Sequence, residues 1–435
     1  MVIQALKQKH LRPYFTNISW LSANEILRKF VALIMGILLA RYLGPEQFGK
    51  FNFAMAFVLI FSIISDFGLR DLVVRDLVRE PDKADEILST AFILKILGGF
   101  SVLGIALVAI RYLRPAEPLI WWLVGIIAAG QTFLAFNIIE YWFQSQVQSK
   151  HYLISKGIVF IGTSLLKIVL IFLKAPLIAF AWITAVEVSL QQLSLLVAYG
   201  QKRKSIKLFP VSSRMAKILL TNGLPIMFAG FALHIQSYID QIMLGQIIGD
   251  EEVGKYTAAF KLIEAFVLIP SIICISISPA ITRAKTKNEN TYYDYLLNVY
   301  RLLFLLFLLV FIPIFLFAQP IIHILYGNAY QYSGQLLAIL AFRLFFVNFG
   351  IVRNLLFVVN DGLFRYSLVT SIIGVVVNVV LNYFLIPQYR SIGAIGASLI
   401  SFSISLVIVD FFYPKARHNF EMMLYAILTP WKLKI

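Results

Sequence analysis

Long apolar runs and short polar segments alternate along the whole chain. Each run comes close to the ~20 residues that an α-helix needs to cross the hydrocarbon core of a bilayer. The pattern therefore predicts an all-α integral membrane protein. We expect about twelve transmembrane helices, at roughly 18–40, 50–67, 87–110, 119–139, 152–173, 177–199, 219–244, 255–278, 298–318, 335–357, 366–386 and 392–413.

The polar connections divide these helices into two sets of six. We expect an N-terminal six-helix bundle at 1–200, a cytoplasmic linker at 201–218, a C-terminal six-helix bundle at 219–413 and a basic cytoplasmic tail at 414–435. The basic linker is either a solvated connection or a docking surface for anionic lipid. None of the connections is long enough to hold a soluble catalytic domain.

One polar hairpin recurs in the second half of the chain. Gly44–Ala54, which follows the first apolar run, is matched 205 positions later by Gly249–Ala259. We interpret the chain as a duplicated unit of about six helices, because this offset is close to half its length. The matched residues are Gly44/Gly249, Glu46/Glu251, Gly49/Gly254, Lys50/Lys255, Phe51/Tyr256 and Ala54/Ala259, with Asn17/Asn222 upstream.

The placement of basic residues predicts the orientation in the membrane. With twelve helices and both termini in the cytoplasm, the inside segments hold 25 Lys and Arg residues and the outside segments hold 7. Cytoplasmic loops of membrane proteins carry such an excess. A missed helix would exchange the sides of all later loops and remove the bias, so the charge pattern supports an even number of helices.

Composition excludes several other classes of protein. The chain is 60% hydrophobic and 14% charged, and its mean hydropathy is +0.83, which a soluble enzyme of this size could not bury. The net charge of +16 is explained by basic loops on one membrane face, without a nucleic-acid partner. Cys274 is the only cysteine, which leaves no disulfide framework and no cysteine-based metal site.

Four short motifs carry a family resemblance: Ala40–Gly49, Asp66–Leu69, Val73–Arg75 and Glu140–Gln144. They resemble the corresponding segments of bacterial oligosaccharide flippases of the Wzx type. These proteins belong to the MATE-like (MOP) superfamily, which also holds multidrug exporters and the peptidoglycan-precursor flippase. The resemblance implies two six-helix bundles related by pseudo-two-fold symmetry around a V-shaped central cavity.

The resemblance also implies a function without bond chemistry. The expected substrate is an undecaprenyl-pyrophosphate-linked oligosaccharide repeat unit for O-antigen, capsule or exopolysaccharide. It would be moved from the cytoplasmic to the outer leaflet of the bacterial inner membrane by alternating access. The lipid bilayer and a polysaccharide polymerase or chain-length machinery are the implied partners, and no cofactor is implied.

Arg28 is the first candidate for the substrate site. It lies about ten residues into the first predicted helix, or ~15 Å, near the middle of the bilayer. A charge there costs about 2.5–3.5 kcal/mol, so it should face a wet cavity or a partner. Asn24 and Glu25 lie one turn away. Arg28 either pairs with Glu25 to fix helix packing or holds an anionic substrate group, as basic residues of this helix do in related lipid flippases.

Other buried charges give the interior a positive sign. Lys95 and Arg343 each lie about eight residues, or ~12 Å, inside their helices and either line the cavity, pair internally or reach toward the surface. Lys167 lies nearer a helix end, where it either reaches the interface or lines the cavity. The full set is Arg28, Lys29, Lys95, Lys167, Lys261 and Arg343 against Glu25, Glu187 and Glu264. A positive cavity suits a phosphate-bearing substrate.

Three carboxylates are candidates for coupling transport to an ion: Glu25, Glu187 and Asp240. Each either carries a proton or cation or pairs with a buried base. Gly44 and Pro45 break the chain between the first two helices, and Gly223 and Pro225 should kink helix seven, so we nominate these four as hinge or gate positions. The alternative is ordinary proline, which membrane helices tolerate.

The sequence contains no phosphate-binding glycine loop, nucleophile elbow, metalloprotease motif or Cys/His cluster, so we predict no catalytic residue, metal or cofactor. The main alternative function is an ion-coupled multidrug exporter of the same superfamily, whose cavity should be acidic. A membrane polymerase should have a large external loop, and a scaffold would not need six buried cations.

Overall fold

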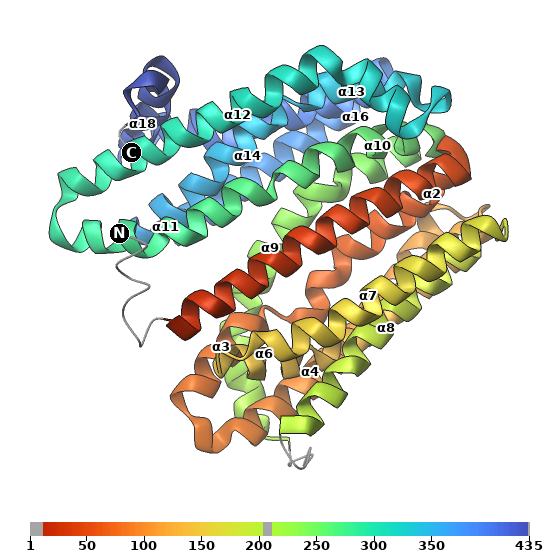
Figure 1. The fold of residues 1–435 in the computed structure, drawn as a ribbon, viewed down its shortest axis with the longest axis horizontal. Coiled ribbons are helices and arrows are strands. Elements are labelled where there is room, and N and C mark those ends of the chain that lie inside the picture. Colours follow the sequence, from red (N-terminus) through yellow and green to blue (C-terminus); the bar gives the residue numbers. More distant parts are fainter. Residues whose placement is uncertain (1–11, 203–210, 434–435) are drawn as a thin grey trace. The chain divides into compact units, whose positions relative to one another are not determined.

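The computed structural model of the protein describes residues 12–202 and 211–433, which form helices joined by short turns, without strands (Figure 1). The first half contains α2 Arg12–Asp66, α3 Leu69–Arg79, α4 Ala84–Leu113, α5 Pro118–Gln131, α6 Asn137–Ser145, α7 Ser149–Phe172 and α8 Leu177–Lys202. The second half contains α9 Ser213–Ile247, α10 Asp250–Phe266, α11 Leu268–Lys287, α12 Glu289–Tyr326, α13 Gln331–Leu340, α14 Arg343–Val352, α15 Val359–Asp361, α16 Phe364–Phe402, α17 Val409–Phe412 and α18 Arg417–Leu428.

Short 3₁₀ and π segments continue or connect these helices. The 3₁₀ segments are η1 Pro81–Lys83, η2 Thr132–Phe136, η3 Asn328–Tyr330 and η6 Pro430–Lys432. Two π-helical segments, η4 Arg353–Val358 and η5 Ser403–Ile408, interrupt the helices of the second half.

Ten stretches of the described chain are long and apolar enough to cross a membrane. Two of them, Ala23–Arg79 with 57 residues and Phe364–Phe412 with 49 residues, far exceed the ~20 residues that one crossing needs. Each contains a break, since Gly44 has φ 70° and Arg390 has φ 49°, both outside the right-handed helical region. The breaks divide the ten stretches into about twelve rods. The predicted all-α membrane class and helix number are confirmed.

The chain divides into two compact units. Unit 1 contains the chain up to Met35 together with Phe53–His234, and unit 2 contains Gly36–Asn52 together with Ile235–Ile435. α2 and α9 therefore each supply residues to both units.

The bundles expected from the sequence, 1–200 and 219–413, divide the chain at other positions and remain a prediction. Part of the linker between them, residues 203–210, lies outside the described residues.

Each unit has its own apolar core. In unit 1, α3, α4, α6, α7 and α8 bury side chains that include Leu69, Val73, Ile87, Phe143, Tyr152 and Leu195. In unit 2, α11, α12, α14, η4 and α18 bury side chains that include Cys274, Tyr292, Tyr300, Phe349, Leu356 and Met422. The second core includes part of the predicted tail, because α18 folds against α12.

The duplicated hairpin has a similar local structure in both copies. Gly44 has φ 70° and ψ 171°, and Gly249 has φ 128° and ψ 172°. Glycine adopts a positive φ without steric cost. An ion pair spans the first helical turn after each glycine: Glu46–Lys50 at 2.6 Å and Glu251–Lys255 at 2.7 Å. These matched geometries are what a duplicated hairpin predicts.

Within unit 2, side-chain contacts hold the backbone of the first hairpin. Tyr330 donates a hydrogen bond from its hydroxyl to the Ala40 carbonyl at 2.9 Å, and burial raises the pKa of this Tyr330 hydroxyl, which therefore stays protonated as a donor. Arg41 donates to the carbonyls of Leu325, at 2.7 Å, and Ile324, at the end of α12.

Candidate functional site

A polar cavity of about 690 Å³ lies within unit 1. Five helices supply its walls: the first arm of α2, then α3, α6, α7 and α8. It is lined by Asn24, Glu25, Arg28, Lys29, Ala32, Arg70, Glu140, Tyr152, Leu153, Lys156, Phe160 and Glu187. Seven of these twelve residues are Asp, Glu, Lys or Arg, and four of the seven are basic. The cavity thus presents a charged surface inside an otherwise apolar unit.

Arg28 is half-buried in the wall of this cavity. Its Nη2 donates a hydrogen bond to Oε1 of Gln191 at 3.0 Å, and its guanidinium carbon lies 5.1 Å from the ring centroid of Phe160, within cation–π range. Among the described residues it has no carboxylate ion-pair partner. The expected alternative of a Glu25–Arg28 pair is therefore not formed here, although Glu25 lines the same cavity.

A short polar chain connects Arg28 with two other predicted site residues. Gln191, next to Arg28, donates from Nε2 to Oε1 of Glu187 at 3.2 Å. Lys167 forms an ion pair with Oε2 of Glu187 at 2.5 Å. The structure thus brings Arg28, Glu187 and Lys167 together, and Asn24 and Glu25 line the same cavity.

A second ion pair lies on another wall of the cavity. Lys156 contacts Glu140 at 2.5 Å and also Oδ1 of Asn137 at 3.4 Å. Two of the carboxylates that line the cavity, Glu140 and Glu187, are thus each paired with a lysine. Arg28 is left as a cavity cation whose charge the described carboxylates do not match.

Lys95 is placed elsewhere in unit 1. It is 1% exposed and forms an ion pair with Asp66. Tyr141 completes a triad, because Lys95 Nζ lies 2.9 Å from its hydroxyl and this hydroxyl donates to Asp66 at 2.7 Å. The three residues join α4, α2 and α6, and Lys95 is not among the cavity-lining residues.

Asp240 is buried in unit 2, where it is 2% exposed. Four neutral side chains donate hydrogen bonds to its carboxylate: Asn382 at 2.8 Å, Asn378 at 3.2 Å, Ser398 at 2.5 Å and Tyr256 at 3.1 Å. Within the described residues no basic group forms an ion pair with it. Hydrogen bonds from neutral donors stabilise a carboxylate but leave its full charge in the interior.

Arg343 also lies in unit 2 and faces aromatic rings. Its guanidinium carbon is 4.8 Å from the ring centroid of Phe260 and 5.2 Å from that of Phe402. Its Nη1 is buried without a hydrogen-bond partner in the described part of the chain. Arg343 and Asp240 thus belong to unit 2, whereas the lining of the polar cavity belongs to unit 1.

The nominated hinge residues differ in geometry. Gly44 and the following Pro45 mark a true break in α2. α9 runs through Gly223 and Pro225 from Ser213 to Ile247. A β-carbon at Gly223 would lie 2.3 Å from the carbonyl oxygen of Phe67, so this glycine permits a close approach of two backbones. Their role in gating remains a prediction.

Sequence reasoning assigned no site role to Arg70, Glu140, Lys156 or Gln191. The first three lie at or near the ends of predicted helices, where a charged side chain does not by itself indicate a buried site. Gln191 follows Glu187 by one helical turn, a spacing that places both on one face. This spacing could have identified Gln191, whereas the Glu140–Lys156 pair depends on how separate helices pack.

Comparisons with known proteins agree with this fold. Residues 15–279 match the family described as "Polysaccharide biosynthesis protein", and residues 225–384 match the family MatE. The chain is 25% identical over 417 residues to the probable low-salt glycan biosynthesis flippase Agl15 of Haloferax volcanii, with 89% of this chain and 82% of that protein covered.

Three solved structures show the same fold at low sequence identity. A multidrug resistance MATE family transporter in an inward-facing conformation has a TM-score of 0.70 at 19% identity, with 93% of this chain and 95% of that chain covered. The lipid II flippase MurJ in an inward closed conformation has a TM-score of 0.69 at 14% identity, with 94% of this chain and 91% of that chain covered. A MOP superfamily transporter from Pyrococcus furiosus has a TM-score of 0.62 at 18% identity, with 96% of both chains covered.

The chain therefore has the fold that solved structures of a multidrug resistance MATE family transporter and of the lipid II flippase MurJ share. Since one family match extends over more than half of its length, the chain belongs to the polysaccharide biosynthesis protein family. The resemblance found in the sequence motifs is confirmed at this level.

Proposed function

We propose that this protein translocates an undecaprenyl-pyrophosphate-linked oligosaccharide repeat unit across the bilayer by alternating access. The product would serve O-antigen, capsule or exopolysaccharide synthesis. The family match and the glycan flippase relative support this substrate class. The saccharide would lie in polar surroundings while the lipid tail stays in the bilayer, and no bond would be made or broken.

The observation that carries the proposal is the environment of Arg28. It faces a cavity large enough for a head group, and its charge is not matched by a carboxylate among the described residues. A guanidinium can bind two phosphate oxygens at once. With Lys29 and Arg70 on the same walls, the cavity offers several cations to one pyrophosphate.

An ion-coupled multidrug exporter is the alternative, because a MATE transporter shares the fold. A cavity for cationic drugs should carry unpaired acidic groups. In the unit 1 cavity, Glu140 and Glu187 are instead paired with lysines. The other charged lining residues are one acid, Glu25, against three bases, Arg28, Lys29 and Arg70. The sign of the available charge favours an anionic substrate.

Coupling to a proton or small cation is part of the proposal. Asp240 is the candidate best supported by geometry, because it is a buried carboxylate surrounded by neutral donors. Glu187 is paired with Lys167, and Glu25 lines the cavity. Both are kept as alternatives.

We also propose a location in the bacterial inner membrane with both termini in the cytoplasm. The bias of basic residues supports this orientation. A polysaccharide polymerase or chain-length protein on the other side of the membrane is the proposed consumer of the flipped repeat unit.

The test is complementation of a flippase-deficient strain that makes the matching glycan. Arg28→Ala, Arg28→Lys and Arg28→Glu are compared with the unchanged protein at equal membrane abundance. Arg365→Ala, which removes an exposed arginine of unit 2, serves as the control. Surface glycan is the readout.

We expect Ala and Glu at position 28 to abolish surface glycan, Lys to retain part of it and the control to retain all of it. Partial rescue by Lys follows because an ammonium keeps the charge but loses the bidentate geometry. Restoration of surface glycan by all three variants would make Arg28 a packing residue and reopen the drug-exporter alternative.

A further inference from the structure

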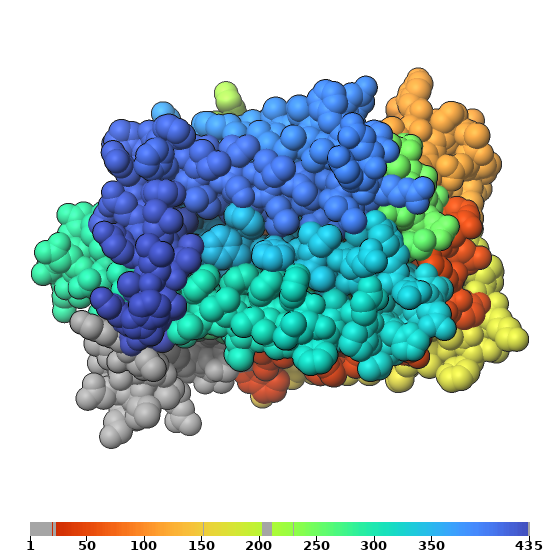
Figure 2. Space-filling view, turned by 90° about the horizontal axis from the view of Figure 1, so that it is seen from above, coloured from red at the N-terminus to blue at the C-terminus, as the bar shows by residue number. Residues whose placement is uncertain are grey.

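The C-terminal helix α18 has two different faces. Asn419, Met422, Met423 and Ala426 follow helical spacing and are buried against unit 2. The opposite face is charged in its first turn, at Arg417, and apolar toward its end. Its large exposed side chains, with those of η6, are Leu424 (42%), Tyr425 (59%), Leu428 (64%) and Trp431 (75%). Figure 2 shows this part of the chain, in dark blue, at the surface of unit 2.

Polar contacts fix α18 in place. Asn419 donates from Nδ2 to Asp410 at 2.8 Å and accepts from the hydroxyl of Tyr300 at 2.7 Å. Asp410 is itself held by Arg353 at 2.7 Å, in a pair that is 1% and 0% exposed. These contacts attach α18 to unit 2 and hold its exposed face in one orientation.

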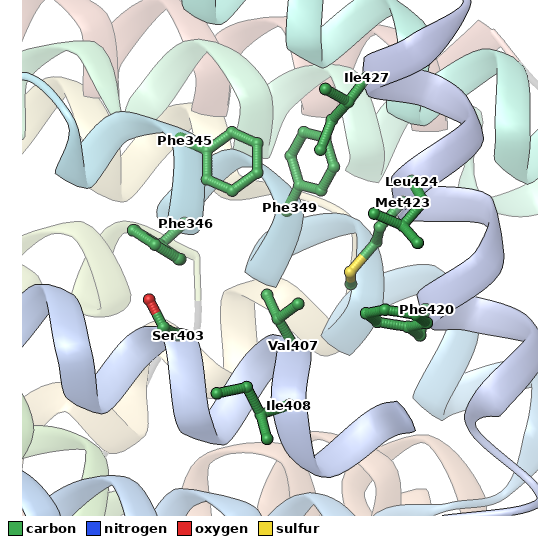
Figure 3. Close-up of a pocket in the computed structure, with 10 residues that line it drawn as sticks. All are labelled: Phe345, Phe346, Phe349, Ser403, Val407, Ile408, Phe420, Met423, Leu424 and Ile427. Carbon is green, nitrogen blue, oxygen red and sulfur yellow. The ribbon is translucent and has the colours of Figure 1, made fainter. Parts of the chain in front are cut away.

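An apolar cavity of about 150 Å³ lies beneath the helix (Figure 3). Phe345, Phe346 and Phe349 come from α14, and η5 and α18 supply the other walls. Ser403 is the single polar side chain in the lining, which also contains Val407, Ile408, Phe420, Met423, Leu424 and Ile427. An apolar cavity of this size can accept a group of about six carbons.

The cavity lies close to one surface of the bilayer. Val407 and Ile408 come five and four residues before the end of the stretch Phe364–Phe412, which corresponds to about 6–8 Å along a helix. Leu424 both lines the cavity and is exposed. The wall of the cavity thus reaches the face of α18 that carries the exposed apolar residues.

The charges around α18 are mainly positive. Lys415 and Arg417 lie at its beginning and Lys432 lies in η6, whereas Glu421 is the acidic residue of the segment 414–433. Basic residues beside an apolar face and an exposed tryptophan are typical of segments that lie at the surface of an anionic membrane.

We propose that α18 and η6 form a docking site for one anionic phospholipid of the bilayer. Its head group contacts Arg417 or Lys432, and the first part of one acyl chain enters the cavity beneath Leu424. The site lies in unit 2 and uses none of the residues assigned to the transported substrate. It does not depend on the proposed function.

The test uses the full-length protein in mild detergent, mixed with equal amounts of phosphatidylglycerol and phosphatidylcholine and analysed by native mass spectrometry. We expect one bound phosphatidylglycerol in preference to phosphatidylcholine by about fivefold or more, the effect of one basic residue near an anionic surface. The double variant Arg417→Gln/Lys432→Gln should lose this preference.

A second pair of variants tests the cavity. Val407→Phe fills it and should reduce the bound lipid several-fold, whereas Val376→Phe makes the same change at a position of α16 that is 55% exposed and should not. Melting temperatures of all variants show whether they are folded. The charge variant provides a test that leaves the lining of the cavity unchanged.

Three outcomes would overturn the proposal. The first is no bound phospholipid, and the second is equal binding of both lipids by the unchanged protein. The third is a bound polyprenyl lipid or a partner protein in place of the phospholipid. Quenching of Trp431 by brominated phosphatidylglycerol, obtained by difference from Trp431→Phe, should exceed quenching by the brominated choline lipid, and equal quenching would count against the site.

Discussion

Gly49 and Gly254, which are equivalent residues of the duplicated hairpin, pack against each other's hairpin in unit 2. A β-carbon on Gly49 would lie 1.7 Å from the carbonyl oxygen of Asp250, and one on Gly254 would lie 1.9 Å from that of Pro45. Asp250 and Pro45 are themselves equivalent positions of the duplication. The contact is therefore reciprocal, and only glycine can occupy either position at this separation.

This contact predicts that Gly49→Ala and Gly254→Ala are each destabilising. A methyl group has no space there, so the two hairpins must move apart, at a cost of about 1–3 kcal/mol or more. Gly104→Ala on α4, where nothing lies within 4 Å of the added carbon, is the matched control and should be neutral or slightly stabilising.

Thermal unfolding of the purified protein in detergent measures these effects. If the Gly254→Ala variant melts at the same temperature as Gly104→Ala, the reciprocal contact is not tight in the native protein.

The Lys95–Asp66–Tyr141 triad predicts a structural role for Lys95. Removing one member of a buried pair costs about 3–5 kcal/mol, and less is expected here because the Asp66 side chain is 24% exposed. Lys95→Met should lower the melting temperature, and the double variant Lys95→Met/Asp66→Asn should recover part of the loss.

Lys83→Met provides the control, since Lys83 pairs with Glu80 at 2.5 Å while both side chains are about half exposed. An exposed pair contributes about 0–1 kcal/mol. Equal melting temperatures for Lys95→Met and Lys83→Met would contradict the triad.

The proposed coupling role of Asp240 predicts a loss of ion dependence when its carboxylate is replaced. Asp240→Asn removes the buried charge but retains the shape, so the variant should fold while transport in proteoliposomes no longer responds to a pH gradient or to sodium. Glu25→Gln and Glu187→Gln, measured in parallel, distinguish the three candidates. An unchanged ion response in Asp240→Asn would move the role to one of the others.

The predicted orientation can be tested with single cysteines. Cys274 is buried and is replaced by Ala. Glu80→Cys should be cytoplasmic and Ala116→Cys should be external, and both positions are exposed. An impermeant thiol reagent should label position 116 in intact cells and position 80 only after permeabilisation. The reverse pattern would invert the proposed topology.

The sequence alone was sufficient to predict the membrane class and the number of helices. A helix that crosses the bilayer requires a run of about 20 apolar residues, and each such run can be recognised from its own residues. The hairpin at Gly44 could also be predicted, because glycine and proline break helices by their own geometry. The duplication could be identified as well, because the match between Gly44–Ala54 and Gly249–Ala259 is found by comparing the sequence with itself.

Partners of the buried charges could not be predicted in this way. The sequence placed Arg28, Lys95 and Arg343 at similar depths and treated all three as cavity candidates. The structure gives Arg28 a partner 163 residues away, Gln191, gives Lys95 a carboxylate on another helix and places Arg343 between two rings.

The physical reason for this difference is the range of the interactions. Insertion into a bilayer depends on the hydropathy of one segment, which its own residues determine. The pairing of a buried charge depends on which faces of different helices meet, and the spacing of residues along one helix does not determine that. The reciprocal contact of Gly49 and Gly254 joins both levels, since the sequence shows the equivalence of the two residues and the tertiary structure alone shows that they touch.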